Sequence, residues 1–194
     1  MIHANGLGRD FGTKRVLRGL DFEVPRGGFL LVTGPNGSGK STLLALCAGL
    51  LTPTAGELQV DAGRAEIGYL AHEPLVYREL SALENLNLYG RLYRVTERRE
   101  RIGMLLERFG LWDARHDRVV SFSRGMTQRL ALCRTLLHSP DLLLLDEPYA
   151  ALDDEGTRVL DEELASLARE RTLVIATHDP ERAAGLASGG LALA

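Results

Sequence analysis

A glycine-rich segment between an apolar run and a helix-like run has the residue types that bind a polyphosphate. The segment follows Phe29–Thr33 and precedes Thr42–Leu46. Glycines let backbone N–H groups turn inward around an anion, and a following helix presents its positive N-terminal end to that anion. Lysine would bridge the β- and γ-phosphates, and a serine hydroxyl would hold Mg²⁺. The spacing predicts a phosphate-binding loop that contacts a nucleotide through Gly34, Pro35, Asn36, Gly37, Ser38, Gly39, Lys40, Ser41 and Thr42.

Two acidic residues at the end of another apolar run supply what a nucleoside triphosphatase needs besides a phosphate loop. Such a site holds Mg²⁺ from a second strand and positions a water in line with the γ-phosphate. Leu142–Leu145 has the pattern of a buried parallel strand and leads into Asp146 and Glu147. We expect Asp146 to reach the metal at the carboxyl end of the sheet and Glu147 to act as general base. Alone, Asp146 and Glu147 could simply begin an acidic loop. Together with the phosphate loop, they predict hydrolysis of a nucleoside triphosphate.

Periodicity places these residues in an α/β domain. Short β-like runs occupy Leu20–Val24, Phe29–Thr33, Glu57–Val60 and Ile67–Leu70, and a later buried run covers Thr172–Thr177. Because strands alternate with helical patterns, we expect a mostly parallel sheet covered on both faces. With 194 residues the chain is long enough for one domain with a substantial core.

A helical insert interrupts this order between Ser81 and His138. Ser81-Ala82-Leu83-Glu84 is a capping-box pattern, and apolar residues then recur at helical spacing from Ile102 to Phe109. We therefore expect a catalytic core with a β subdomain at residues 1–80 and 139–194, and a helical subdomain at residues 81–138. Six arginines between Arg91 and Arg108 face Glu97, Glu100 and Glu107. This run could be a basic patch, but we expect a solvated helix face with paired charges.

Composition limits the partners and the location. The net charge of −3 offers no global attraction to nucleic acid. The longest apolar stretch, Leu43–Leu51, is too short to span a bilayer, and Met1–Asn5 lacks the start of a signal peptide. We expect a cytoplasmic protein that reaches a membrane only through a partner. Cys47 and Cys133 have no cysteine or histidine companions, so we expect small buried side chains.

Three further segments, in order after the phosphate loop, resemble the ATP-binding-cassette (ABC) ATPase family. They are Ser123–Arg129, at the place of that family's signature motif, Asp146–Asp153, and Thr177-His178-Asp179. The resemblance covers nearly the whole chain. It implies the family's fold, a RecA-like parallel sheet core with an N-terminal antiparallel β region and a helical insert, together with ATP and Mg²⁺ as ligands and ATP hydrolysis as activity.

The same resemblance implies a head-to-tail homodimer with ATP at the interface. The signature of one copy would cover the γ-phosphate held by the other, and Asp153 would cross the interface. His178 would contact the γ-phosphate and join Lys40 and Glu147 as catalytic residues. Phe11 matches the aromatic residue that stacks on adenine, although a core-facing phenylalanine is nearly as plausible. The signature contacts to nucleotide would come from Ser123, Arg124, Gly125 and Met126.

Two departures from the family pattern bear on the site. The signature reads Phe122-Ser123-Arg124-Gly125-Met126 where Leu-Ser-Gly-Gly-Gln is usual, so Arg124 adds positive charge near the γ-phosphate. The loop that usually carries glutamine has His72, which we assign with Ser41 and Asp146 to the metal site, directly or through water. A histidine there can change its charge around neutral pH. Glu73 could serve instead if the register slips by one.

Within the family, the segments Leu70–Pro74, Glu79–Leu86 and Phe122–Met126 resemble the haem-exporter ATPase of bacterial cytochrome c maturation. We therefore expect a subunit that drives membrane transporter subunits from the inner face of the cell membrane, with haem as cargo and no nucleic-acid partner. Multidrug and polysaccharide exporters share much of this pattern and remain the main alternative. A non-transport cassette and a phosphate-loop kinase are weaker alternatives. The chain stops at Ala194, where relatives usually continue, so a truncated or unusually short end also stays open.

Overall fold

The centre of the molecule is a five-stranded parallel sheet in the order β5-β6-β7-β3-β8. The computed structural model describes residues 1–168 and 170–194. The strands are β3 (Phe29–Thr33), β5 (Ile67–Leu70), β6 (Leu142–Asp146), β7 (Thr172–Thr177) and β8 (Gly189–Ala192). Each neighbouring pair is parallel. The predicted parallel sheet is confirmed, and β8 is a strand that the sequence did not reveal.

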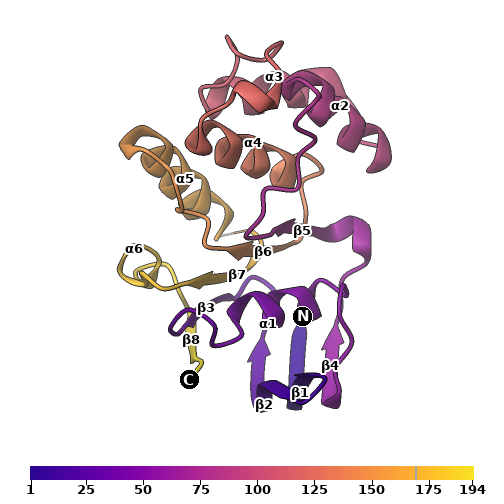
Figure 1. The fold of residues 1–194 in the computed structure, drawn as a ribbon, viewed down its shortest axis with the longest axis vertical. Helices are drawn as coiled ribbons and strands as arrows, with labels where there is room; N and C mark the ends of the chain where they lie inside the picture. The colour runs from indigo at the N-terminus through magenta and orange to yellow at the C-terminus, as the bar shows by residue number, and fades with distance from the viewer. Residues whose placement is uncertain (169) are drawn as a thin grey trace.

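Alternate side chains of these strands pack into two separate hydrophobic cores, one on each face of the sheet. Leu143 and Leu145 of β6 pack into the core beneath α4 (Arg124–Leu136) and α5 (Asp154–Leu167), whereas Leu142 and Leu144 pack into the core that contains α1 (Lys40–Cys47). Because the inner strands β6, β7 and β3 are buried on both faces, they are mostly apolar and do not alternate with polar residues, whereas the edge strand β8 is largely exposed. Figure 1 shows α1 on one side of the sheet and α2 to α5 on the other.

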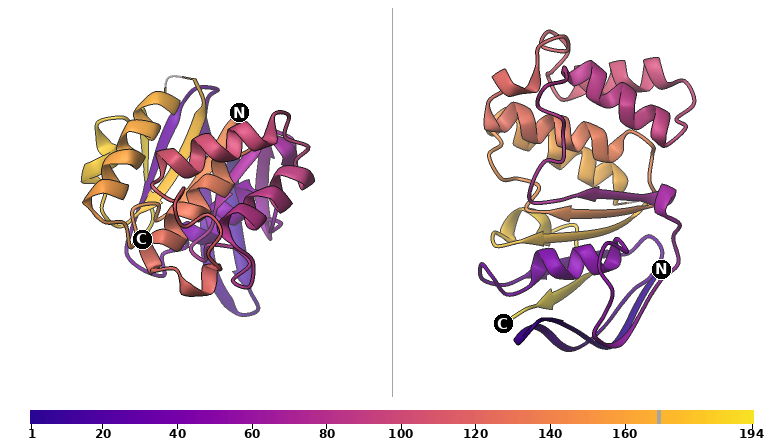
Figure 2. Two further views of the ribbon diagram at one scale, coloured as in Figure 1. Left: turned by 90° about the horizontal axis from the view of Figure 1, so that it is seen from above. Right: turned by 45° about the vertical axis from the view of Figure 1, so that its right-hand side comes forward.

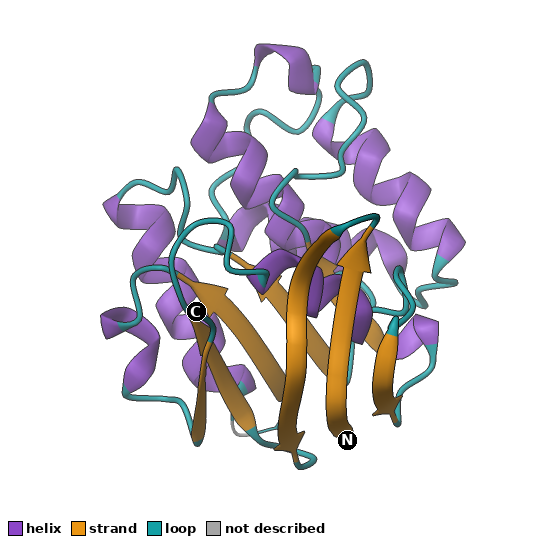
Figure 3. Ribbon diagram, turned by 60° about the horizontal axis from the view of Figure 1, so that its bottom comes forward, coloured by secondary structure: helices purple, strands orange, loops and turns teal. Residues whose placement is uncertain are grey.

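A second, antiparallel sheet covers α1 from outside. It has the order β2-β1-β4, with β1 (Ile2–Phe11), β2 (Lys14–Val24) and β4 (Ala55–Val60). Figure 2 shows the layers stacked as helices, parallel sheet, α1 and antiparallel sheet, and Figure 3 shows the antiparallel strands from their own side. The predicted strand Leu20–Val24 is the end of a longer one. Register shifts between Ala4 and Asp10 break the period-two pattern of β1, which explains why its bounds could not be predicted.

The segment between Ser81 and His138 contains three helices: α2 (Ala82–Leu92), α3 (Arg98–Arg108) and α4. The predicted capping box at α2 is confirmed. The Ser81 hydroxyl accepts a hydrogen bond from the backbone of Glu84, and the Glu84 carboxylate accepts one from the backbone of Ser81 at 2.8 Å. After β6, α5 and the short α6 (Glu181–Ala184) flank β7, and 3₁₀ turns occur at Arg64–Glu66 and Val119–Ser121.

The arginine run differs from its predicted pairing. Among the described residues, none of Glu97, Glu100 and Glu107 forms an ion pair, and Arg108 pairs instead with Glu163 of α5. Arg101 is partly buried and donates to the backbone carbonyl of Leu136. The prediction of internally paired charges is therefore wrong, because α3 turns some of these side chains toward α4 and α5.

The two cysteines are buried, as predicted. Burial raises the pKa of the Cys47 thiol to about 12, and burial likewise raises the pKa of Cys133. Both thiols therefore behave as small apolar groups at neutral pH. Of the helices in residues 1–168 and 170–194, none combines the length and the apolar character needed to cross a membrane.

Gly68 on β5 is a position where packing demands glycine. A Cβ atom there would lie 2.7 Å from Cγ of Pro140, 2.8 Å from the carbonyl oxygen of Thr135 and 2.9 Å from Cδ2 of Leu143. We predict that Gly68→Ala lowers the free energy of unfolding by about 1–3 kcal/mol, because overpacking pushes α4 off the sheet. Urea unfolding followed by circular dichroism measures the change.

The matched control is Gly103→Ala on α3. Its added Cβ would meet only Cζ3 of Trp112, at an ordinary 3.7 Å. Since alanine favours a helix over glycine, this variant should be unchanged or more stable by about 0.5–1 kcal/mol. Equal stability of Gly68→Ala and the wild type would contradict the packing argument.

Candidate nucleotide site

The phosphate-binding loop runs from the end of β3 to the start of α1, and glycine is required at its end. Gly39, the N-cap of α1, has a φ of 101°. A Cβ atom at this position would also lie 2.6 Å from Cδ2 of Leu17. Both the left-handed backbone and the close packing exclude a side chain. The loop therefore presents its N–H groups at the start of a helix, as the sequence predicted for an anion site.

Lys40 is the first residue of α1, and its side chain reaches back to the start of this loop. Its side chain is only 6% exposed, and Nζ donates hydrogen bonds to the carbonyl oxygens of Gly34 at 2.7 Å and Pro35 at 3.1 Å. Nζ also lies 3.9 Å from Oε1 of Glu147. The ammonium group is therefore held between the loop and the Glu147 carboxylate, which follows the end of β6.

Glu147 is oriented by the end of β7. Oε2 accepts a hydrogen bond from the Thr177 hydroxyl at 3.0 Å, and Oε1 accepts one from the backbone N–H of His178 at 3.0 Å. The ring Nδ1 of His178 lies 2.9 Å from Oε2. Because three groups fix this carboxylate, it has one well-defined orientation. Thr177 was not predicted as a site residue, although its place at a strand end beside His178 was a usable signal.

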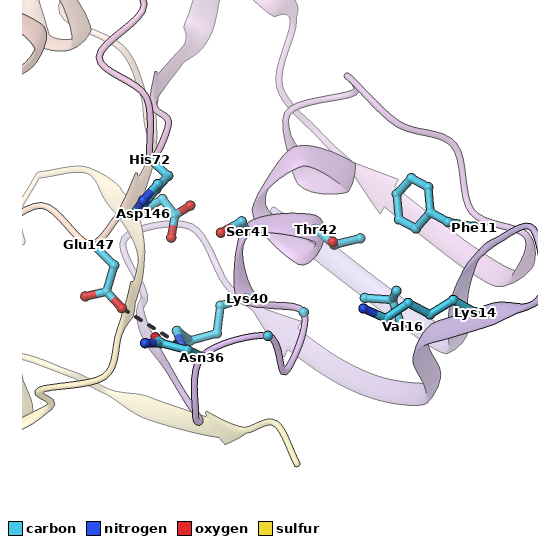
Figure 4. A pocket seen from close by; sticks show the side chains of 12 residues that line it. Phe11, Lys14, Val16, Asn36, Lys40, Ser41, Thr42, His72, Asp146 and Glu147 are labelled. Atoms are coloured by element: carbon cyan, nitrogen blue, oxygen red, sulfur yellow. Dashed lines mark ion pairs between the residues drawn. The ribbon is translucent and has the colours of Figure 1, made fainter.

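The carboxylate of Asp146, unlike that of Glu147, is not fixed by hydrogen bonds from described residues. The residue is 2% exposed, and neither carboxylate oxygen accepts a hydrogen bond from any described residue. Burial raises the pKa of this carboxyl, against the charges of His72 and Lys40 and the nearby hydroxyl of Ser41. Figure 4 shows the Ser41 hydroxyl directed toward Asp146. A buried carboxylate with a serine hydroxyl beside it fits a divalent cation that both oxygen groups would hold.

The donor set suits Mg²⁺ in particular. Mg²⁺ is commonly bound through one or two protein oxygens, substrate phosphates and waters, so a complete protein cage is unnecessary. Within residues 1–168 and 170–194, no three His, Cys, Asp or Glu side chains gather as a metal-binding group. The residues that fit the ion are Ser41 and Asp146, with His72 on the same cavity.

These groups line one cavity of about 620 Å³. Phe11, Lys14 and Val16 lie on the side opposite Asp146 and Glu147 (Figure 4). Phe11 is 45% exposed, so the core-facing alternative is wrong. Lys14 and Val16 were not predicted as site residues. The remaining lining comes from the loop, α1 and the strand ends, namely Asn36, Gly37, Gly39, Lys40, Ser41, Thr42 and His72.

Arg9 supports Phe11 from outside the cavity. Its guanidinium carbon lies 4.6 Å from the centre of the Phe11 ring, and Nη1 donates to the carbonyl oxygen of Thr52 at 2.9 Å. A cation held over one ring face fixes the ring while the ring still lines the cavity. No sequence motif pointed to Arg9, because the carbonyl oxygen that accepts the hydrogen bond from its side chain belongs to Thr52, 43 residues further along the chain.

The predicted signature residues do not line this cavity. Ser123 caps α4 and accepts a hydrogen bond from the backbone of Met126 at 3.1 Å. Arg124 lines a different cavity, of about 660 Å³, together with Glu73 and His72. His72 thus lies on both cavities and Glu73 on the second, which favours His72 over the slipped register. One chain brings the phosphate loop together with Asp146 and Glu147 but leaves the predicted signature residues apart.

The signature helix is tied instead to the segment that follows Glu147. Gln128 Nε2 donates to the carbonyl oxygen of Pro148 at 3.2 Å. Asp153 caps α5 by accepting a hydrogen bond from the backbone of Gly156 at 2.9 Å, and its carboxylate lies 3.9 Å from Arg129 of α4. Near its other end, α4 carries Arg134, which is buried and donates to the carbonyl oxygen of Tyr69 at 2.7 Å. Asp153 therefore serves as a helix cap within its own chain.

Comparison with protein families finds a match between residues 17–150 and the model of the ABC transporter family. A daunorubicin resistance ATP-binding protein of Streptomyces coeruleorubidus is 38% identical over 91% of this chain and 59% of its own length. The Nod factor export ATP-binding protein I of Rhizobium johnstonii is 36% identical over 94% of this chain and 62% of its own length. The ABC transporter ATP-binding protein NatA of Bacillus subtilis is 34% identical over 96% of this chain and 82% of its own.

Solved structures show the same relationship. An ATP-binding subunit of an ABC transporter matches all of this chain and 85% of its own, with a TM-score of 0.91 and 26% identity. A dimeric ATP-binding cassette in a post-hydrolysis state with ADP and Pi matches all of this chain and 94% of its own, with a TM-score of 0.85 and 27% identity. The chain spans about three fifths of the length of several of its curated relatives.

The Arg9 contact gives a prediction for nucleotide binding. We expect Arg9→Ala to raise the dissociation constant of a fluorescent ATP analogue about 2- to 10-fold, because a cation–π contact of about 0.5–1 kcal/mol and the ring position it maintains are lost. Fluorescence titration measures the constant. Arg18→Ala, at an exposed position on β2 outside the cavity, is the control and should bind as the wild type does. Equal affinity of Arg9→Ala and wild type would show that Phe11 is positioned without Arg9.

Proposed function

The chain belongs to the ABC transporter family, and we propose that it is the subunit of a membrane exporter that binds and hydrolyses ATP. The observation that carries this proposal is the cluster at one edge of the parallel sheet. Lys40 of the phosphate loop, the unpartnered carboxylate of Asp146 and the oriented carboxylate of Glu147 line one cavity there. A phosphate clamp, a cation site and a proton acceptor are the groups that ATP hydrolysis requires.

ATP binding would use the cavity from end to end. We place adenine against Phe11 and the phosphates in the loop, at the N-terminus of α1. Nζ of Lys40 would exchange the carbonyl oxygens of Gly34 and Pro35 for oxygens of the β- and γ-phosphates, to which it can donate stronger, charge-assisted hydrogen bonds. Ser41, Asp146 and His72 would hold Mg²⁺, which when bound neutralises charge on the phosphate oxygens.

Hydrolysis would use Glu147 as the general base. A water attacks the γ-phosphorus, the bond to the leaving oxygen of ADP breaks, and the Glu147 carboxylate accepts the proton of the water. Thr177 and the backbone N–H of His178 keep this carboxylate in place. The His178 ring is 64% exposed, so one edge can contact the γ-phosphate while Nδ1 stays on Glu147.

We further propose a head-to-tail homodimer. Two observations support it: the signature does not line the nucleotide cavity of its own chain, and a similar cassette of known structure is dimeric. In such a dimer, Ser123, Arg124, Gly125 and Met126 of one copy would cover the ATP of the other, and Asp153 would lie at the interface. Residues 81–138 would act as the helical subdomain that carries the signature.

The names of two relatives bear on which compound the proposed exporter carries. Their names refer to daunorubicin resistance and Nod factor export, which supports the exporter alternative in which a drug-like or saccharide compound is carried. We propose that the chain works at the inner face of the cell membrane with transporter subunits of that class. Haem export and a role in cytochrome c maturation gain no support from these relatives and stay predictions.

Removing the base tests the catalytic assignment. We expect Glu147→Gln to lower the ATPase rate by about 10²- to 10⁴-fold, because the amide cannot accept the proton. ATP binding should persist, and an ATP-dependent dimer should accumulate in size-exclusion chromatography. Glu107→Gln, an exposed position on α3, is the control and should hydrolyse ATP as the wild type does. A wild-type rate in Glu147→Gln would exclude this residue as general base.

The exporter assignment has a separate test in the organism that carries the gene. We expect a deletion strain to become more sensitive to compounds in a drug panel, to regain resistance with the wild-type gene and not with Glu147→Gln, and to keep holo-cytochrome c. A membrane subunit should co-purify from detergent extracts. Loss of holo-cytochrome c with unchanged drug sensitivity would favour haem over a drug-like compound as the cargo. Absence of any co-purifying membrane subunit would count against a role in transport.

A further inference from the structure

Tyr149 lies two residues after Glu147, and its side chain contacts two helices that come later in the chain. The hydroxyl donates a hydrogen bond to Oδ1 of Asp161 on α5 at 2.7 Å. The guanidinium carbon of Arg182 on α6 lies 5.8 Å from the centre of the ring. Tyr149 is not among the described residues that line the nucleotide cavity. The proposed ATPase mechanism therefore leaves this side chain without a role.

The hydroxyl of Tyr149 is suited to be an anchor and not an acid. Partial burial raises the pKa of this phenol, and the hydrogen bond to Asp161 raises it further. The ring packs against the hydrophobic core beneath α4 and α5, while the hydroxyl reaches the carboxylate. A hydrogen bond to an ionised acceptor is about twice as strong as one between neutral groups. The side chain is therefore fixed at both its ring and its tip.

The backbone on both sides of Tyr149 has a conformation that needs support from outside. Glu147 has a φ of 48° and Ala151 a φ of 63°, in the left-handed region that side chains other than glycine rarely adopt. Two backbone hydrogen bonds close this turn, from Ala150 to Glu147 at 3.0 Å and from Leu152 to Tyr149 at 3.2 Å. Such strained residues persist only where their surroundings hold them. Tyr149 stands between the two and supplies a side-chain anchor for the turn.

Arg182 connects this turn to the segment that follows His178. The backbone N–H of His178 donates to Oε1 of Glu147 at 3.0 Å, and its ring Nδ1 lies 2.9 Å from Oε2. Shortly after His178, α6 begins, and its Arg182 faces the ring of Tyr149. Both α5 and α6 lie on the left of the molecule in Figure 1. The two segments therefore contact each other twice, through Glu147 with His178 and through Tyr149 with Arg182.

We propose that Tyr149 is a positioning residue for ATP hydrolysis: its hydrogen bond to Asp161 holds the turn that aims the Glu147 carboxylate at the attacking water. This inference rests on the proposed function, because it assigns Tyr149 to the same reaction. Tyr149 acts through Glu147 and does not itself contact the nucleotide. Its loss should therefore slow the chemical step and leave ATP binding in place, since a small displacement of a catalytic group is enough to lower a rate.

Removal of the hydroxyl is the first test. We expect Tyr149→Phe to lower kcat about 3- to 30-fold and to leave the KM for ATP within about twofold of wild type. Phosphate release at a series of ATP concentrations gives both constants, at a temperature well below the thermal unfolding of each variant. Tyr77→Phe is the matched control, because it removes the same hydroxyl from a tyrosine that is 54% exposed. The control should hydrolyse ATP as wild type does.

Variants of Asp161 test whether the hydrogen bond itself matters. Asp161→Ala removes the acceptor and should lower kcat as Tyr149→Phe does. Asp161→Asn should keep most of the rate, because the amide oxygen still accepts a hydrogen bond from the phenol. Tyr149→Phe combined with Asp161→Ala should be no slower than either single variant, since both remove the same bond. Additive losses in the double variant would show that the two residues act separately and would overturn the proposal.

The Glu147→Gln background separates positioning from a general loss of structure. If Tyr149 acts through the Glu147 carboxylate, adding Tyr149→Phe to Glu147→Gln should leave the residual rate unchanged within about twofold, because residues that act as a unit are not additive. A further loss of the full size seen in Tyr149→Phe alone would contradict this route of action.

The positioning role and the ATPase mechanism fail in different ways. A wild-type kcat in Tyr149→Phe, or an equal loss in Tyr77→Phe, would overturn the positioning role while a slow Glu147→Gln still supported the mechanism. A rise in KM that accounts for the whole loss would likewise place Tyr149 in ATP binding and overturn the proposal. A wild-type rate in Glu147→Gln would instead exclude the general base, whatever the Tyr149 variants do.

Discussion

The whole site depends on the hydrogen-bonded register of three neighbouring parallel strands, β3, β7 and β6. Thr33 at the end of β3 is paired with Thr177 of β7, and Asp146 of β6 is paired with Ala176. The backbone N–H of Glu147 donates to the carbonyl oxygen of Ala176 at 2.8 Å and so extends this pairing beyond the last strand residue. Because parallel strands end at one edge, segments far apart in the chain deliver their side chains to one place.

A single backbone feature explains why two consecutive acidic residues share that place. Consecutive side chains of a strand point to opposite faces of the sheet. Glu147 has a φ of 48°, in the left-handed region that non-glycine residues rarely adopt. This turn breaks the alternation, so Asp146 and Glu147 both line the nucleotide cavity. They nevertheless differ: Asp146 lacks donors and suits a cation, whereas Glu147 is held by donors and suits proton transfer.

The sequence predicted the parts of the fold that obey local rules. Apolar runs such as Phe29–Thr33 and Ile67–Leu70 became strands with the expected bounds, and the capping box of Ser81 and Glu84 formed at the start of α2. Features that depend on distant partners were missed. The irregular register of β1, the hydrogen bond from Arg9 to Thr52 and the pairing of Arg108 with Glu163 all arise from segments that meet only in the folded chain. The phosphate loop, the Asp146-Glu147 pair and the Thr177-His178 pair were recognisable because each combines a short residue pattern with a strand end.

The two attachments of α4 have a mechanical consequence. Through Gln128 the helix is bonded to Pro148, directly after Glu147, and through Arg134 it is bonded to the strand that leads into His72. A helix of 13 residues is a stiff rod about 20 Å long. If one of the two bonded segments moves, either the other moves with it or α4 tilts. A tilt of α4 moves Ser123, which caps its N-terminus. Movement at either of these two hydrogen bonds would therefore move the N-terminal end of α4, where Ser123 lies.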